Sequence, residues 1–157
     1  MAESKAPPPI EELLPHRYGM LLVERIVSWD GSRASVSATP SADGWYAEAG
    51  GMPSRIGIEL MAQAIASHVS LVAWSKGEPP KKGVLLGARS YRATQPYFAA
   101  GSELTVTAVK AFSDESGMGA YDATIELAGN EVAKARILVF EPPDFEAFIA
   151  AQTGGRK

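Results

Sequence analysis

The sequence predicts an α+β fold in which an antiparallel six-stranded sheet wraps around one long central helix. A single long apolar stretch in the middle of the 157-residue chain lacks the two-residue period of a strand. Two segments before it and four after it are bounded by turn residues and are typical of strands, and several of them alternate between apolar and polar residues. Because an apolar helix must be covered by other elements, we expect the sheet to enclose it.

The segments before the helix predict a short helical turn and then a hairpin. Residues 10–14 (IEELL) can form one turn that Pro15 ends. Residues 20–30 (MLLVERIVSWD) are expected to form a strand with both faces partly buried. The turn signal Asp-Gly-Ser follows, and residues 33–40 (RASVSATP) alternate like a half-exposed strand.

The central stretch predicts one helix from about Ser54 to Ser75, reached through a glycine-rich loop at residues 41–53. Pro53 or Ser54 can begin the helix, because proline suits the first turn and serine caps helices. Gly77 can end it, since glycine adopts the backbone conformation that follows a helix at low cost.

Four further strands and a short terminal helix complete the expected domain. The strands are residues 83–96, 102–112, 119–127 and 131–140, and the helix is residues 144–152. We expect a single domain over residues 10–150. A disordered tail at residues 1–9 and a flexible tail at residues 151–157 flank it.

Composition excludes several kinds of function. The net charge is −3 and the longest basic run is the pair Lys81 and Lys82, so a nucleic-acid ligand is not expected. The absence of cysteine excludes disulfides, thiolate zinc sites and cysteine nucleophiles. No cluster of ligating residues stands out, so no metal and no tightly held cofactor are expected.

The apolar segments predict neither export nor a membrane span. The first residues, MAESKAPPP, lack the apolar core of a signal peptide. Polar residues interrupt the longest apolar stretch at Glu59, Gln63 and Ser67. The expected location is therefore the cytoplasm.

One acid, Glu59, lies in the apolar helix and heads a narrow polar seam. With Glu59 set at zero on a helical wheel, Ser70, Gln63 and Ser67 fall at about 20°, 40° and 80°. Buried carboxylates are rare unless they are paired or used. Glu59 is therefore either a structural partner of loop amides, Arg55 or Arg17, or a functional group.

The histidine on this helix, His68, cannot assist Glu59. His68 lies about 180° from Glu59 on the same wheel. It is expected to be a core histidine that forms a hydrogen bond to the backbone.

Three motifs, LLPHRYGMLLVERIVSWDG, IELMAQA and AAGSELTV, together resemble those of the FabZ-type 3-hydroxyacyl-acyl carrier protein dehydratases, which have the hotdog fold. The run LLPHRYGMLLVERIVSWDG contains His16 and resembles the N-terminal motif of that family. IELMAQA places Glu59 at the family's catalytic acid and Gln63 at its helix glutamine. AAGSELTV resembles the family's turn before a strand. The stretches GMPSRIGIELMAQAIASH and LLGARSYRA further resemble the ApeP-like branch, which is associated with aryl polyene-type pigment synthesis.

The resemblance implies a reaction and a set of site residues. FabZ-type dehydration removes the C2 proton of a 3-hydroxyacyl thioester and protonates the leaving hydroxyl, so it needs a base and an acid. We expect the catalytic residues to be Glu59 and His16. Expected substrate-binding residues are Gln63, Trp45, Gly51 for close backbone approach, and Ser54 at the helix amides that can polarise the thioester.

The chain departs from the family at the usual catalytic histidine. Counting back from Glu59 to the corresponding loop position gives Trp45, and GWYAEAGGMP contains no histidine. His16 is one replacement, although the matching family histidine is interpreted as structural. Glu48 as a carboxylate base, Tyr46 as a proton donor and Glu59 acting alone are the alternatives.

Three functions remain open on the sequence alone: an active dehydratase in fatty-acid or polyene-type synthesis, a hotdog acyl thioesterase with Glu59 as base or nucleophile, and a non-catalytic acyl-binding partner of an active dehydratase. Partners implied by the resemblance are an acyl carrier protein or CoA thioester. A homodimer, a higher oligomer or a heterodimer with a related dehydratase is expected, because hotdog sites form between two protomers.

Overall fold

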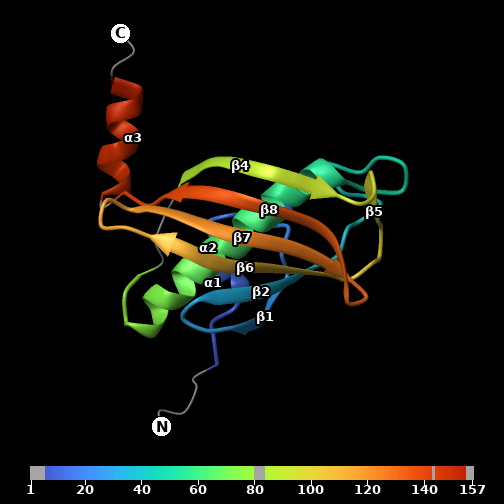
Figure 1. Ribbon diagram of the computed structural model, residues 1–157, viewed down its shortest axis with the longest axis horizontal. Helices are drawn as coiled ribbons and strands as arrows, with labels where there is room; N and C mark the ends of the chain where they lie inside the picture. The colour runs from blue at the N-terminus through green and yellow to red at the C-terminus, as the bar shows by residue number, and fades with distance from the viewer. Residues whose placement is uncertain (1–5, 80–83, 143, 155–157) are drawn as a thin grey trace.

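The computed structural model describes residues 6–79, 84–142 and 144–154, and these form an antiparallel sheet around a helix (Figure 1). The sheet has six strands in the spatial order β1-β2-β6-β7-β8-β4. Its strands are β1 (Arg25–Trp29), β2 (Arg33–Ala38), β4 (Val84–Ala93), β6 (Leu104–Ser113), β7 (Met118–Leu127) and β8 (Asn130–Phe140). Every neighbouring pair is antiparallel, which confirms the predicted architecture.

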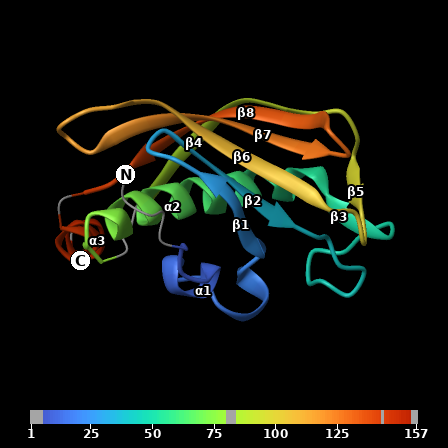
Figure 2. The ribbon, with the colours of Figure 1, turned by 90° about the horizontal axis from the view of Figure 1, so that it is seen from below.

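The long helix α2 (Gly57–Ser75) lies against the concave side of the sheet, which arches over it in Figure 2. A 3₁₀ turn, Ser54–Ile56, precedes α2, so the predicted span is confirmed. By length and composition, residues 54–75 could cross a membrane, but 61% of the apolar window is buried inside the protein. This burial accounts for the apolar character of α2 as that of a core helix.

Both strands of the first hairpin differ from the expectation. β1 is shorter than predicted, because Tyr18–Met20 form a 3₁₀ turn and the chain becomes a strand only at Arg25. β1 is an edge strand and is largely exposed rather than buried on both faces. β2 is buried almost throughout rather than half exposed. Its small serines are covered by neighbours, as Ser35 shows with hydrogen bonds to Arg33 and Thr107.

A second, two-stranded sheet was not predicted. One of its strands precedes α2 in the sequence and the other follows β4. This sheet pairs β3 (Gly51–Pro53) with β5 (Tyr97–Ala99). Gly51 is required there, because a Cβ at this position would lie 2.3 Å from the Phe98 carbonyl oxygen. Three-residue strands are too short to show a period, which explains why the sequence did not reveal them.

Short helices flank the domain at both ends of the described chain. α1 (Ile10–Leu13) confirms the predicted turn and buries Ile10 and Leu13. α3 (Phe145–Gly154) includes residues 151–154, which were assigned to a flexible tail, and projects away from the sheet in Figure 1. Residues 1–5 and 155–157 of the two predicted tails lie outside the described residues, as do Lys81 and Lys82.

Candidate active site

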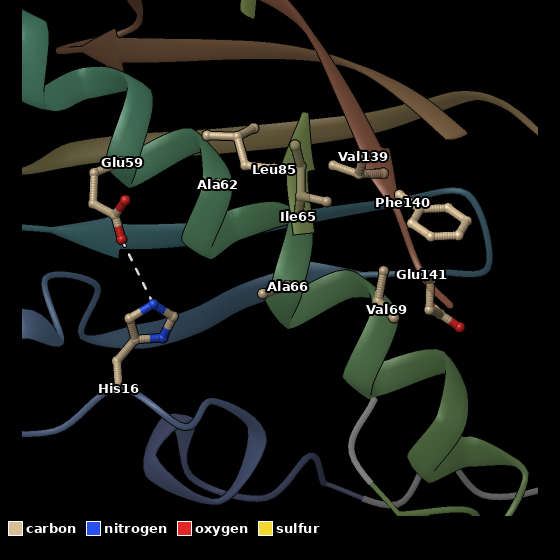
Figure 3. A pocket seen from close by; sticks show the side chains of 10 residues that line it. All are labelled: His16, Glu59, Ala62, Ile65, Ala66, Val69, Leu85, Val139, Phe140 and Glu141. Carbon is tan, nitrogen blue, oxygen red and sulfur yellow. Dashed lines mark ion pairs between the residues drawn. The ribbon is translucent and has the colours of Figure 1, made fainter. Parts of the chain in front are cut away.

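The structure brings His16 and Glu59 together at the edge of a cavity. His16 follows α1 in an extended segment, and Glu59 lies in the first turn of α2. The Nε2 atom of His16 is 3.6 Å from Oε1 of Glu59, as the dashed line in Figure 3 shows. The two side chains are 27% and 36% exposed, so both are partly desolvated and still accessible. The pair is therefore placed to share a proton and to reach a ligand.

Gln63 holds this pair in place from one turn further along α2. Its Nε2 donates to Oε1 of Glu59 at 3.0 Å and to the Met20 carbonyl at 2.7 Å. Its Oε1 accepts from the backbone amides of Leu22 and Val23. Since Gln63 is fully buried and its amide is fully occupied, it acts on the site through Glu59.

Two features of α2 surround the Glu59 side chain. Glu59 is the acid in the first turn of α2, where the partial positive charge of the helix N-terminus is strongest. The Gln63 amide adds a donated hydrogen bond to the carboxylate. The second ring nitrogen of His16, Nδ1, is buried without a hydrogen-bond partner among the described residues.

A cavity of about 210 Å³ extends from the pair along α2. Small and apolar side chains dominate its walls: Ala62, Ile65 and Ala66 from α2, with Leu85 from β4 and Val139 from β8. In Figure 3, His16 and Glu59 stand at one end, and Val69, Phe140 and Glu141 stand at the other. An apolar chain with a polar reacting head suits such a cavity.

Like Gln63, the remaining residues predicted to bind substrate lie outside this cavity. Trp45 is 58% exposed, and its indole N–H donates to the Gly19 carbonyl at 2.7 Å. The Gly51 amide donates to the Glu48 carbonyl, and the Ser54 amide donates to the Pro96 carbonyl, so neither N–H is available to a thioester. Their roles in substrate binding stay predictions. Within one chain, their N–H groups form hydrogen bonds to backbone carbonyls of the protein itself.

The alternative partners of Glu59 are also engaged elsewhere. Glu48 pairs with Arg55 at 3.1 Å, away from the cavity. Arg17 donates to the carbonyls of Leu14 and His16. The hydroxyl of Tyr46 accepts from the Ser41 amide in a buried position.

His68 lies in the core, as the wheel predicted. It is fully buried, with Nε2 3.1 Å from the Asp30 carbonyl and Nδ1 2.8 Å from the Tyr121 hydroxyl. Burial lowers the pKa of His68 below its ordinary value of 6.5, so the ring is neutral at pH 7.

The contribution of the sheet to the site was missed by the sequence analysis. Leu85 and Val139 form the wall opposite α2, and Tyr121 lines the neighbouring cavities. The alternation in β8 could have indicated that Val139 faces inward, but which strand faces which turn of the helix depends on the sheet order. Within the described ranges, no group of three or more metal-ligating side chains occurs.

Comparison with known proteins relates this geometry to one enzyme family. Residues 8–150 match the family model described as ApeP-like, ApeP dehydratase. The 3-hydroxyacyl-[acyl-carrier-protein] dehydratase FabZ of Brucella ovis is 32% identical over 139 residues, covering 80% of this chain and 81% of that protein. FabZ of Chlamydia muridarum is 32% identical over 94 residues, covering 55% of this chain and 61% of that protein.

Solved structures agree on the fold. A chain of the dehydratase heterocomplex ApeI:P from Xenorhabdus doucetiae superposes with a TM-score of 0.85 at 26% identity, covering 94% of this chain and 99% of that one. A hypothetical thioesterase with coenzyme A from Streptococcus pneumoniae has a TM-score of 0.60 at 16% identity, covering 74% and 84%. The second likeness is one of fold alone.

Proposed function

This chain belongs to the ApeP-like dehydratase family, and from that premise we propose that it removes water from 3-hydroxyacyl thioesters in fatty-acid or polyene-type synthesis. The observation that carries the proposal is the His16–Glu59 pair, 3.6 Å apart at the mouth of an apolar cavity. The pair supplies a base and an acid, and the cavity suits an acyl chain.

In the proposed reaction the pair holds one proton between its two members. Neutral His16 takes the C2 proton of the substrate through Nε2, while the acid form of Glu59 protonates the C3 hydroxyl. The C3–O bond breaks, the electrons of the C2–H bond form the C2–C3 double bond, and water leaves. The proton on His16 then returns to Glu59 across the 3.6 Å separation, which restores the starting state.

A direct assay tests this proposal. Purified protein is given a 3-hydroxyacyl thioester on a carrier protein or on CoA, and the 2-enoyl product is followed. We expect product from the wild type and a large loss in both His16→Asn and Glu59→Gln. Product formation that survives both substitutions would remove the pair from the mechanism. Release of free thiol without enoyl product would favour the thioesterase alternative.

A related dehydratase is part of the proposed working assembly. Trp45 stands where FabZ-type enzymes carry a loop histidine, so a histidine-bearing partner can complete a second site. The likeness to a chain of the ApeI:P heterocomplex supports such a heterodimer. In the part of the chain that the structure describes, β4 is an edge strand and exposes Leu85 and Leu86, so it offers both apolar surface and backbone groups for pairing.

The assembly is tested by co-expressing this chain with a related histidine-bearing dehydratase. Co-purification, with activity above that of either protein alone, supports the heterodimer. A stable homodimer that is fully active alone supports the homodimer instead. The proposed compartment is the cytoplasm, and the choice between carrier protein and CoA follows from comparing both thioesters in the same assay.

A further inference from the structure

Three adjoining cavities follow α2, and their lining changes from apolar to polar along the helix. Cavities of about 140 and 170 Å³ lie beyond the one at the His16–Glu59 pair. Val69 and Glu141 line all three. Val69 is ten residues beyond Glu59 on α2, so it stands about 15 Å from Glu59 along the helix axis.

We propose that Val69 marks the boundary between an apolar acyl channel and a polar chamber, and that Val69, Lys110 and Tyr121 select the acyl tail. The proposal rests on the dehydratase function above and names the residues that determine its chain specificity. A plain alkyl tail ends at Val69, and a longer tail is accepted when its end carries a hydrogen-bonding group.

The chemistry of the chamber explains the boundary. Before Val69 the walls contribute alanine, isoleucine, leucine and valine side chains, which match an alkyl chain. Beyond Val69, Lys110 and Tyr121 line both further cavities, and Glu141 lines these two as well as the end of the first cavity beside Val69 (Figure 3). An alkyl end placed there would displace water from these polar groups. Because the alkyl end cannot form the hydrogen bonds that the water formed, this costs free energy.

The buried His68–Tyr121 pair defines what the chamber offers to a ligand. The Asp30 carbonyl can only accept, so Nε2 of His68 carries the hydrogen and Nδ1 accepts from the Tyr121 hydroxyl. The Tyr121 oxygen keeps the capacity to accept a hydrogen bond, and the Lys110 ammonium, which lines the same two cavities, is a donor. A terminal hydroxyl, which both donates and accepts, satisfies the two groups at once.

Selectivity is measured on the full-length protein, in its active assembly, with three 3-hydroxyacyl thioesters: a short alkyl chain, a long alkyl chain, and the same long chain with a terminal hydroxyl. We expect the wild type to prefer the short chain and the hydroxylated long chain over the long alkyl chain by about tenfold, the factor that corresponds to 1.4 kcal/mol. Lys110→Met should reduce or reverse the preference between the two long chains. Val69→Ala should widen the boundary and raise the relative rate of the long alkyl chain.

Matched controls lie elsewhere on the sheet. Lys134→Met changes a lysine on β8 that lines none of the three cavities, and Val27→Ala changes an exposed valine on β1. Neither control should alter the order of the three substrates. Equal wild-type rates on the two long chains, or an unchanged order in both Lys110→Met and Val69→Ala, would overturn the proposal.

Binding without turnover separates this inference from the proposed function. Glu59→Gln is titrated with the same three thioesters, and the Kd is measured by calorimetry. Binding in the predicted order without turnover in the wild type would contradict the dehydratase function and leave the tail selectivity supported. Turnover by the wild type, with binding that does not distinguish the long chains, would contradict the selectivity alone.

Discussion

His68 and Tyr121 form a buried hydrogen bond, with Nδ1 of the ring 2.8 Å from the phenol oxygen, and both groups are neutral at pH 7. Burial lowers the pKa of His68 and, together with the nearby Glu141 carboxylate, raises the pKa of Tyr121. A proton added to Nδ1 would remove the acceptor that the Tyr121 hydroxyl uses. The neutral ring is therefore the form that the folded protein stabilises.

The first prediction is that the protein loses stability as the pH falls below about 6.5, the ordinary pKa of histidine. In that range the unfolded chain binds a proton at His68 that the folded protein does not bind. The free energy of unfolding therefore decreases until the pH reaches the lowered pKa of His68. Urea unfolding at several pH values measures this slope.

The control for this prediction is the same series on His68→Gln, whose absolute stability is lower but whose slope should be smaller. Asp30, Asp114 and Asp122 also have lowered pKa values, held down by hydrogen bonds from Ser32, Ser116 and Arg136. Their contributions disappear only below about 3.8, the ordinary aspartate value, and so do not overlap. Identical slopes in the two proteins would contradict the prediction.

The second prediction separates activity from stability at the proposed catalytic pair, His16 and Glu59. His16→Asn and Glu59→Gln should each lower kcat by about 10²–10⁴-fold, the usual loss for a general acid or base. The free energy of unfolding should change by less than about 1 kcal/mol, because a contact between two partly exposed polar side chains contributes little. Glu103→Gln removes the ion pair with Arg25 on the surface and should leave kcat unchanged.

The third prediction is that Gln63 is a positioning residue. Gln63→Leu removes the hydrogen bond to Glu59 and leaves the amides of Leu22 and Val23 without their acceptor. We expect a loss of about 1–3 kcal/mol in stability, the cost of unsatisfied buried groups. In the protein that remains folded, kcat should fall more than KM rises, since Gln63 does not line the cavity.

Ser67→Ala is the comparison for this prediction. It removes one hydrogen bond, from the Ser67 hydroxyl to the Gln63 carbonyl, one turn further along α2. It should cost less stability than Gln63→Leu and leave kcat near the wild-type value. A rise in KM alone in Gln63→Leu would instead indicate direct substrate contact.

The fourth prediction concerns the small sheet of β3 and β5. Gly51→Ala would place a Cβ 2.3 Å from the Phe98 carbonyl oxygen, and backbone on both strands must then move. We expect a loss of about 1–3 kcal/mol, as for other overpacked positions. Gly31→Ala is the matched control, because a Cβ there meets nothing within 4 Å. Similar thermal unfolding of the two variants would contradict the close contact between β3 and β5.

Much of the fold could be predicted because its main elements are long and regular. β6, β7 and β8 are each ten or more residues long and contain a run of alternating apolar and polar residues, and α2 shows no such alternation over nineteen. β3 and β5 are three residues each and carry no period. β1 is exposed because it lies at the edge of the sheet. Local sequence patterns do not indicate the order of strands in a sheet, so this exposure could not be predicted.

The candidate site could be predicted only in part, for a related reason. The wheel excluded His68 from any contact with Glu59, because both residues lie on one rigid helix. Whether His16 reaches Glu59 depends on how the chain after α1 packs on α2. Gln63 holds that packing by donating a hydrogen bond to the Met20 carbonyl and accepting from the amides of Leu22 and Val23. No spacing in the sequence indicates these bonds.

The hydrogen bonds between Gln63 and the backbone of Leu22 and Val23 also make the packing of the site measurable by hydrogen exchange. Leu22 and Val23 precede β1, so their amides have no strand partner and bond to a side chain on α2 instead. These two amide hydrogens can exchange with solvent only when the segment that carries His16 separates from the helix that carries Glu59. Their exchange rates therefore measure how often His16 and Glu59 come apart, at two backbone positions that lie outside the proposed chemistry.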